Sequence, residues 1–172
     1  MRKHAIFLSG PIGVGKTTIG RALAARLGGA FVDGDDHAEP GRPWYSSILR
    51  TSASIVATGL QLLETRTFLV VAYPLGCTTW IYHRRKFSDA GVSPIFVTIR
   101  ASYESIIAPA RGREFSAAER ERIKVMLSEG YADRAFSDLT IDTDQVPVAT
   151  IAAKLVDAIR PLIASSPGLT LG

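Results

Sequence analysis

Eight consecutive residues near the start of the chain constrain its fold more than any other feature of the sequence. Residues Gly10 to Thr17 read Gly-Pro-Ile-Gly-Val-Gly-Lys-Thr and match the pattern G-x-x-x-x-G-K-[ST] without a gap. Glycines permit the tight backbone path that points successive amide N–H groups at phosphate oxygens. A helix that begins directly after such a loop adds the positive end of its dipole. The motif therefore predicts a nucleotide-binding loop between a strand and a helix.

Each residue of this loop has an expected role toward a nucleotide. We expect Lys16 to reach the β- and γ-phosphates of ATP and the Thr17 hydroxyl to bind Mg²⁺. The predicted cofactor-binding residues are Gly10, Pro11, Ile12, Gly13, Val14, Gly15, Lys16, Thr17 and Thr18. The motif indicates binding of ATP or GTP, but it does not say what is done with the phosphate.

Apolar periodicity along the rest of the chain predicts strands that alternate with helices. Strands are expected at Ala5–Ser9, Ala30–Val32, Thr67–Tyr73, Pro94–Ile99 and Leu139–Asp142. Helices are expected at Thr17–Leu27, from near Ser46 to Leu63, and at Thr79–Ala90, Tyr103–Ala108, Ala117–Glu129 and Val148–Ile163. This order favours the α/β class, with a mostly parallel sheet covered by helices on both faces. We expect one domain over residues 1–164 and a flexible tail over 165–172.

The composition limits the classes of function to be weighed. The formal net charge is +4, but the 20 basic residues are scattered among 16 acidic ones, which argues against a nucleic-acid partner. No run of about 18 or more apolar residues occurs, so a membrane-spanning helix is not expected. The single cysteine, Cys77, fits a reducing cytoplasm, and we see no secretory signal. The sequence thus favours a cytoplasmic protein that acts on a small molecule, and it leaves the oligomeric state open.

Two groups of basic residues are interpreted as helix surface. Arg84, Arg85 and Lys86 form the only compact basic run, and contact with a ligand or an acidic partner is the alternative for it. Arg120 and Arg122 alternate with glutamates, a pattern typical of an exposed helix. Neither group is assigned to the reaction site.

An acidic pair follows the second predicted strand. Asp33 and Asp35 lie where the strand ends, and ligands of open α/β sheets bind at that edge. Two carboxylates one residue apart can divide the work, one assisting the metal and the other accepting a proton from an attacking hydroxyl. The pattern by itself does not say which of the two carboxylates takes which role. The alternative is a solvated acidic turn.

A basic segment between two predicted helices is the candidate lid. Arg111 and Arg113 flank Gly112, which would give the segment freedom to move, and we favour Arg113 slightly as the arginine that contacts the phosphates. A basic helix cap on the surface is the alternative. The predicted catalytic residues are Lys16, Asp35, Arg113 and Arg111.

The loop between the acidic pair and the next helix mixes basic and aromatic residues. Such a mixture suits a pocket for a polar, anionic small molecule, although the aromatic residues could instead pack as core. The predicted substrate-binding residues are Asp33, Asp35, His37, Arg42, Trp44 and Arg50.

The glycine-rich loop and the Phe-Val-Asp-Gly-Asp segment at residues 31–35 together resemble small-molecule kinases typified by shikimate kinase and gluconate kinase. The resemblance covers the first third of the chain and returns at residues 136–143. It implies a three-layer P-loop NTPase fold of the nucleoside-monophosphate-kinase type, with a five-stranded parallel sheet and a lid at about residues 109–118. It also implies Mg-ATP as the phosphoryl donor and a hydroxyl as the acceptor, with Asp33 assisting the metal and Asp35 contacting that hydroxyl.

The chain departs from both families at the acceptor end. Shikimate kinases have three glycines after their third strand, whereas this chain has Tyr73-Pro74-Leu75-Gly76, and the arginine that binds the shikimate carboxylate has no clear counterpart. Gluconate kinases carry a lysine near the position of Cys77. We therefore expect a sugar acid or a related polyol-like acceptor that is neither shikimate nor gluconate.

Two other functions stay open at this point. Residues 129–131 and 141–143, together with the candidate lid, loosely resemble chloramphenicol phosphotransferase, which suggests an antibiotic phosphotransferase. A non-catalytic ATP-binding switch is the other possibility, and it would make no use of Asp35.

Overall fold

The computed structural model describes residues 1–165, without the side chains of residues 44 and 45. Except for Ser165, the predicted tail lies outside the described residues. The strands are β1 (His4–Ser9), β2 (Ala30–Asp33), β3 (Phe68–Ala72), β4 (Ser93–Arg100) and β5 (Leu139–Asp142). The helices are α1 (Lys16–Leu27), α2 (Trp44–Thr65), α3 (Cys77–Asp89), α4 (Tyr103–Ile107), α5 (Ala117–Ser128) and α6 (Val148–Ser165), with short 3-10 helices η1 (Gly34–His37) and η2 (Pro109–Arg111).

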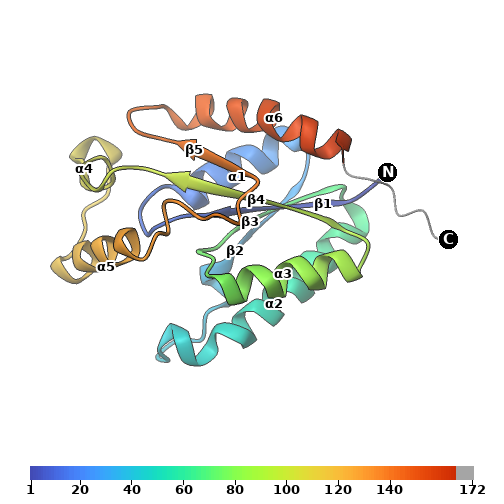
Figure 1. The fold of residues 1–172 in the computed structure, drawn as a ribbon, viewed down its shortest axis with the longest axis horizontal. Helices are drawn as coiled ribbons and strands as arrows, with labels where there is room; N and C mark the ends of the chain where they lie inside the picture. Colours follow the sequence, from blue (N-terminus) through green and yellow to red (C-terminus); the bar gives the residue numbers. More distant parts are fainter. Residues whose placement is uncertain (166–172) are drawn as a thin grey trace.

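All five strands pair in parallel, in the order β2-β3-β1-β4-β5. Helices α1 and α6 cover one face of this sheet and α2 and α3 the other, so that the domain has three layers (Figure 1). The predicted α/β fold class and the order of its elements are confirmed.

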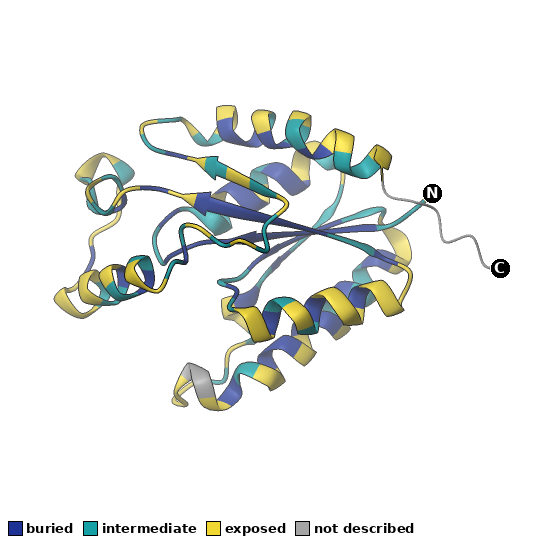
Figure 2. Ribbon diagram, in the orientation of Figure 1, coloured by how far each residue is buried: buried dark blue, intermediate teal, exposed yellow. Residues whose placement is uncertain are grey.

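Alternation of side chains along the strands produces two separate cores. In β1, Ile6 and Leu8 pack in the core beneath α1 and α6, whereas Ala5 and Phe7 pack in the core beneath α2 and α3. Because both faces are covered, the strand is apolar at consecutive positions, as is typical of a parallel sheet. Figure 2 shows the result, with buried strands at the centre and helices whose outer faces are exposed.

The start of helix α3 differs from the prediction for a local reason. Helix α3 begins at Cys77, two residues before the predicted start. The Thr79 hydroxyl accepts a hydrogen bond from the Gly76 amide at 3.0 Å, so Gly76 serves as the N-cap and the helix starts directly after it. This earlier start brings Cys77 and Thr78 to the edge of the sheet where the strands end.

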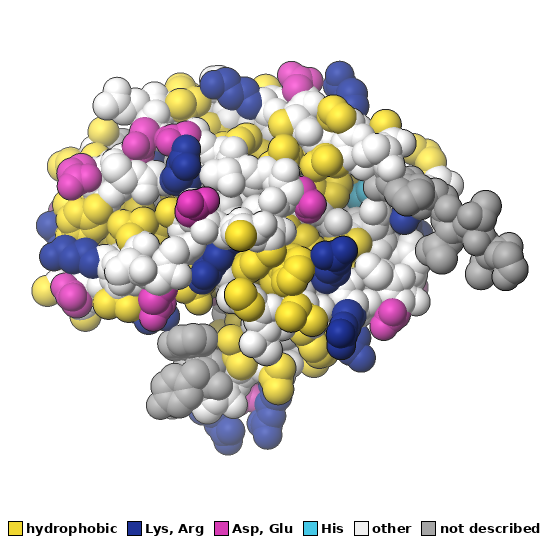
Figure 3. All heavy atoms as spheres, viewed as in Figure 1, with side chains coloured by type: hydrophobic (Ala, Val, Ile, Leu, Met, Phe, Trp, Pro, Cys, Tyr) yellow, Lys and Arg dark blue, Asp and Glu magenta, His cyan; other side chains and the backbone are white. Residues whose placement is uncertain are grey.

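Charged side chains of both signs are mixed on the surface of the molecule. On the face shown in Figure 3, lysine and arginine side chains are scattered among acidic ones and form no continuous stripe. Within residues 1–165, no helix combines the length and the apolar character needed to cross a membrane.

Candidate active site

The glycine-rich loop leaves the central strand β1 and enters α1 at Lys16. Its path needs glycine at Gly10, where an added Cβ would lie 2.5 Å from the Ile99 carbonyl oxygen, and at Gly13, where φ is +77°. The Lys16 ammonium donates hydrogen bonds to the carbonyl oxygens of Gly10 at 3.0 Å and Pro11 at 2.7 Å. The predicted loop and its lysine are thus in one compact turn at the start of a helix.

The environment of Lys16 disfavours its charged form. Burial lowers the pKa of the ammonium to about 8, although the carboxylates of Asp35 and Asp33 act in the opposite direction. The nearby Arg113 lowers the pKa further. A polyanion bound at the loop would reverse this balance, because it would supply the negative charge that the ammonium lacks.

The structure brings the acidic pair to the loop. The Thr17 hydroxyl donates a hydrogen bond of 2.7 Å to Asp33 Oδ2, while the Asp35 amide donates one of 3.1 Å to Asp33 Oδ1. Asp33 is the last residue of β2 and the N-cap of η1, so both of its oxygens are held in place. This turn rests on Tyr73, because a Cβ added at Gly34 would lie 2.2 Å from the tyrosine ring.

The Asp35 carboxyl has fewer hydrogen-bond partners than that of Asp33, and its pKa is shifted. Its carboxyl accepts none of the hydrogen bonds found among the described residues, and it faces the same cavity as Lys16. Loss of solvation and the neighbouring Asp33 carboxylate raise the pKa of Asp35, against the influence of the Lys16 ammonium. A carboxylate with a raised pKa is the kind of group that accepts a proton during catalysis.

The candidate lid lies against the glycine-rich loop. Arg111 donates hydrogen bonds to the Val14 carbonyl at 3.2 Å and to the Ser105 hydroxyl at 3.1 Å. The Phe115 ring packs on Gly13, where an added Cβ would lie 2.5 Å from it. Arg113, which the sequence favoured, is exposed, stacks over Phe115 at 4.6 Å and pairs with a glutamate of α5. Arg111 therefore contacts the loop directly, whereas Arg113 lies above it.

A cavity of about 1300 Å³ surrounds these groups. The sheet order places the ends of β2 and β3 on one side of the loop and those of β4 and β5 on the other. On the β4–β5 side the lining includes Thr143, Gln145, Val146, Pro147, Val148 and Ile151. On the β2–β3 side it includes Ser47, Ile48, Thr51, Tyr73, Cys77 and Thr79, with Tyr131 near Gly76, while Arg122 and Met126 line it from α5.

Three predicted substrate-binding residues lie outside the lining of this cavity. Arg42 and Arg50 both pair with Glu39, at 3.4 and 3.2 Å, and their side chains are 58% and 71% exposed. His37 Nδ1 lies 2.7 Å from the Ser54 hydroxyl. The structure thus places these side chains away from the cavity, with Glu39 as a local partner of Arg42, in the segment before α2, and of Arg50, on α2 itself. The Trp44 side chain lies outside the described residues.

The sequence interpretation also missed an arginine of the cavity. Arg122 was expected on the surface of α5, but it is half-buried in the cavity lining. Ala118, Arg122 and Met126 recur every four residues and all line the cavity, so they share one helix face. The apolar Met126 on the same face was a signal that could have identified Arg122.

The oxygen donors at the loop fit Mg²⁺. Among residues 1–165 no cluster of three or more histidine, cysteine or acidic side chains could hold a metal ion by itself. Mg²⁺ is usually bound through one or two protein oxygens together with phosphate oxygens and water. The Thr17 hydroxyl and Asp33 Oδ2, 2.7 Å apart, are a donor set of that kind.

Comparison with known proteins agrees with this geometry. The family model for shikimate kinase matches residues 12–41. The shikimate kinase of Acinetobacter baumannii (strain AYE) is 28% identical over 168 residues, which cover 90% of this chain and 91% of that protein.

Solved structures extend the likeness to the whole fold. A gluconokinase from Sinorhizobium meliloti 1021 superimposes with a TM-score of 0.68 at 21% identity, covering 97% of this chain and 100% of that one. The tunicamycin resistance protein of Deinococcus radiodurans gives 0.65 at 18% identity, covering 92% and 96%. The chain resembles P-loop kinases of the shikimate and gluconate kinase type, and the comparisons support a small-molecule kinase.

Proposed function

We propose that the chain transfers the γ-phosphoryl group of ATP to a hydroxyl of a small polar metabolite. The hydrogen bond of 2.7 Å between Thr17 and Asp33 carries this proposal, because it joins the phosphate-binding loop to the acidic turn. With Asp35 held two residues further on, a nucleotide and an acceptor hydroxyl can meet in one cavity. A switch that only binds ATP would have no use for Asp35 beside its phosphates.

The two sides of the cavity suggest where each substrate lies. If the phosphates bind to the amides of the glycine-rich loop, the base of the nucleotide would lie near the apolar residues Val146, Val148 and Ile151, beyond β4 and β5. The acceptor would then occupy the β2–β3 side, next to Asp35 and Tyr73. In this arrangement the carboxylates of Asp33 and Asp35 would face the terminal phosphate.

The residues of the chain divide the transfer among them. Asp35 orients the acceptor hydroxyl and takes its proton as the acceptor oxygen bonds to the γ-phosphorus and the bond to the β–γ bridging oxygen breaks. Lys16 and Arg111 stabilise the negative charge on the phosphate oxygens. Mg²⁺, held by Thr17 and Asp33, would neutralise charge on the β- and γ-phosphates.

The segment over residues 109–118 is proposed to act as a lid. Arg111 and Phe115 connect it to the glycine-rich loop, and Gly112, with φ of +70°, lies between them in open space. Closure of such a segment would exclude water from the phosphoryl group and so suppress hydrolysis.

The acceptor pocket favours a hydroxylated compound with one acidic group. Arg122 lines the cavity from the face of α5 that also carries Met126, and in our proposal it binds a carboxylate of the acceptor. Tyr73, Met126 and Tyr131 add apolar and aromatic surface that a fully hydroxylated sugar does not require. We infer a sugar acid or a related polyol-like compound, and neither shikimate nor gluconate.

A second candidate is phosphorylation of an antibiotic. The likeness in fold to the tunicamycin resistance protein and the large, partly apolar cavity favour it. Growth of a host that expresses the gene on a panel of hydroxylated antibiotics tests it. Protection against one compound, lost in Lys16→Ala, would support this candidate, and indifference to all of them would count against it.

The main proposal is tested by coupled ADP release with Mg-ATP and a panel of sugar acids, polyols and hydroxylated metabolites. We expect at least one compound to raise ADP release above the ATP-only rate, and ³¹P NMR should show a new phosphate ester. The Lys16→Ala variant should show neither. The proposal fails if no compound raises the rate although calorimetry shows that the protein binds Mg-ATP.

A further inference from the structure

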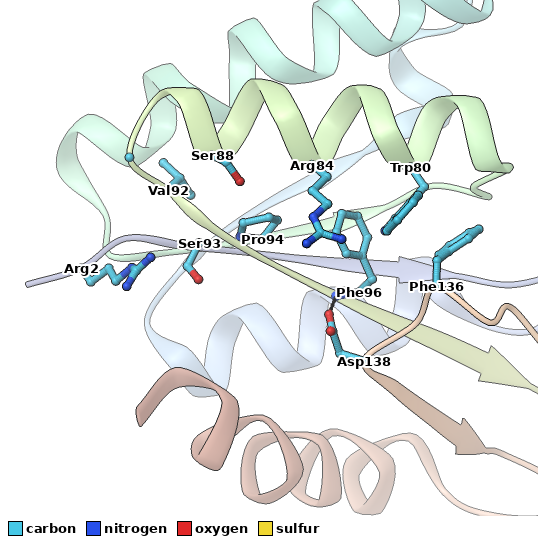
Figure 4. Close-up of a pocket in the computed structure, with 11 residues that line it drawn as sticks. Arg2, Trp80, Arg84, Ser88, Val92, Ser93, Pro94, Phe96, Phe136 and Asp138 are labelled. Atoms are coloured by element: carbon cyan, nitrogen blue, oxygen red, sulfur yellow. Dashed lines mark hydrogen bonds between the residues drawn. The ribbon is translucent and has the colours of Figure 1, made fainter. Parts of the chain in front are cut away.

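A second cavity, of about 260 Å³, lies between α3 and the strands β4 and β5. Helix α3 presents Trp80, Arg84 and Ser88 to it, four residues apart along one face, while Asp138 closes the opposite wall (Figure 4). None of its lining residues lines the cavity around the glycine-rich loop. It is therefore a separate site and is not an extension of the reaction site.

The charged groups of this cavity are held in position. The Arg84 guanidinium lies 5.3 Å from the centre of the Trp80 ring, which in turn stacks on Phe136 at 5.0 Å. Asp138 accepts a hydrogen bond of 2.8 Å from the Phe96 amide through Oδ2, and its own amide donates one of 2.8 Å to the Phe96 carbonyl. Stacking and backbone pairing thus place an exposed guanidinium and an exposed carboxylate on facing walls.

Arg84 has no acidic partner among the described residues. Its one interaction there is with the Trp80 ring, and Asp138 lies beyond ion-pair distance. Arg2 also lines the cavity and adds a second positive charge, so the lining carries two guanidinium groups and one carboxylate. A planar guanidinium that is positioned in advance binds a carboxylate or phosphate with little loss of side-chain entropy.

We propose that this cavity binds a small organic acid that also carries a hydrogen-bond donor, such as a hydroxyl or an ammonium group. The acid would pair with Arg84, supported by the charge of Arg2, and the donor would reach Asp138 Oδ1. The volume fits a metabolite rather than a larger ligand. Neighbouring residues of the basic run at positions 84–86 would therefore have different roles, because Arg84 lines the cavity and Arg85 does not.

Arg84 and Arg85 supply a matched pair of variants. Both are exposed and adjacent on α3, so Arg84→Gln and Arg85→Gln remove the same charge. Malate, glutamate and glycerol 3-phosphate serve as probes of a hydroxy acid, an amino acid and a phosphate ester, titrated into the full chain by calorimetry at fixed ionic strength. In a Trp44→Phe background Trp80 is the sole tryptophan, so its fluorescence reports on the cavity directly.

We expect saturable binding of at least one probe in the millimolar range or tighter. Arg84→Gln should lower the affinity for that probe about tenfold or more, because one charge-assisted pair is lost. Arg85→Gln should change the affinity by less than about twofold. Equal weakening in the two variants would overturn the proposal, since it would indicate only surface charge. Absence of any saturable heat and of any change in Trp80 fluorescence would also overturn it.

Asp138 provides a second and independent test. Asp138→Asn can still accept from the Phe96 amide, so the fold should be kept while the negative charge is lost. Succinate, which has no donor, should then bind more tightly than it binds the parent protein, whereas malate should not gain. A malate affinity that rises as much as that of succinate would show that Asp138 accepts nothing from the ligand.

Discussion

The phosphate end and the acceptor end of the main cavity are built in opposite ways. The proposed phosphate end comes mainly from one continuous segment, the glycine-rich loop with Lys16, to which the lid adds Arg111. The acceptor end comes from η1, α2, the turn after β3 and α5, which are far apart in the sequence. Each segment there contributes a few side chains, such as Ser47, Ile48 and Thr51 from α2. A site of backbone groups tolerates few changes, whereas a site assembled from side chains can change its ligand without a change of fold.

The largest expected effect is at the phosphate end. Lys16→Ala should lower phosphoryl transfer by about 10³-fold or more, because the charge that the lysine supplies to the transferring group is lost. The exposed Lys154→Ala, on α6, is the matched control and should turn over normally. Wild-type turnover by Lys16→Ala in the ADP-release assay would refute the role of the loop.

The same variant should be more stable than the parent at pH 7. Burial lowers the pKa of Lys16 from an ordinary value of 10.5 to about 8, so the folded state loses stability as the pH falls from 10.5 through 8. Below pH 8 that cost is complete, and removal of the ammonium should raise the free energy of unfolding by about 1 kcal/mol or more. Urea unfolding at pH 7 measures this gain, and its absence would show that the ammonium is not destabilising.

Asp35 lies where the two ends meet, and its replacement should have the next largest effect. Asp35→Asn should lower kcat about 10²-fold while ATP affinity changes less than about twofold. Since its pKa is raised, the parent enzyme should lose activity on acidification at a higher pH than an ordinary aspartate would dictate, and the variant should lack this limb. Equal losses of ATP binding and turnover would instead place Asp35 beside the metal.

Substitutions at two glycines distinguish the effect of lost packing between the lid and the loop from the effect of backbone strain alone. Gly13 and Gly112 both have positive φ, at +77° and +70°, but only an added Cβ at Gly13 would collide with Phe115. Gly112→Ala should cost about 1 kcal/mol of stability and Gly13→Ala about 2–4 kcal/mol. Comparable melting temperatures for the two variants would show that Phe115 does not rest on the loop.

The smallest expected effects are at the acceptor end, once the acceptor is found. Arg122→Ala should raise the KM for an acidic acceptor about tenfold without changing the KM for ATP, because one charge-assisted contact is removed. Arg42→Ala should change either constant by less than about twofold, since its partner is Glu39 on the surface. The opposite ranking would restore the loop at residues 37–50 as the acceptor site.

The sequence alone determined the parts of this protein that depend on local chain geometry. The strands and helices follow from apolar periodicity, and the phosphate loop follows from a motif whose eight residues are consecutive in the chain. The position of Asp33 and Asp35 near the ligand could be predicted as well, because ligands of such folds bind at the carboxyl ends of the parallel strands. These predictions needed only residues that are close together in the chain.

The tertiary structure decided which side chains line the acceptor end. Arg42 and Arg122 carry the same charge and the sequence assigned them opposite places, yet Glu39 holds the first on the surface and the helix face shared with Met126 turns the second into the cavity. The direction of a long side chain depends on neighbours that the fold brings from distant segments. Periodicity and motifs do not contain that information, so the phosphate donor could be inferred from the sequence and the acceptor could not.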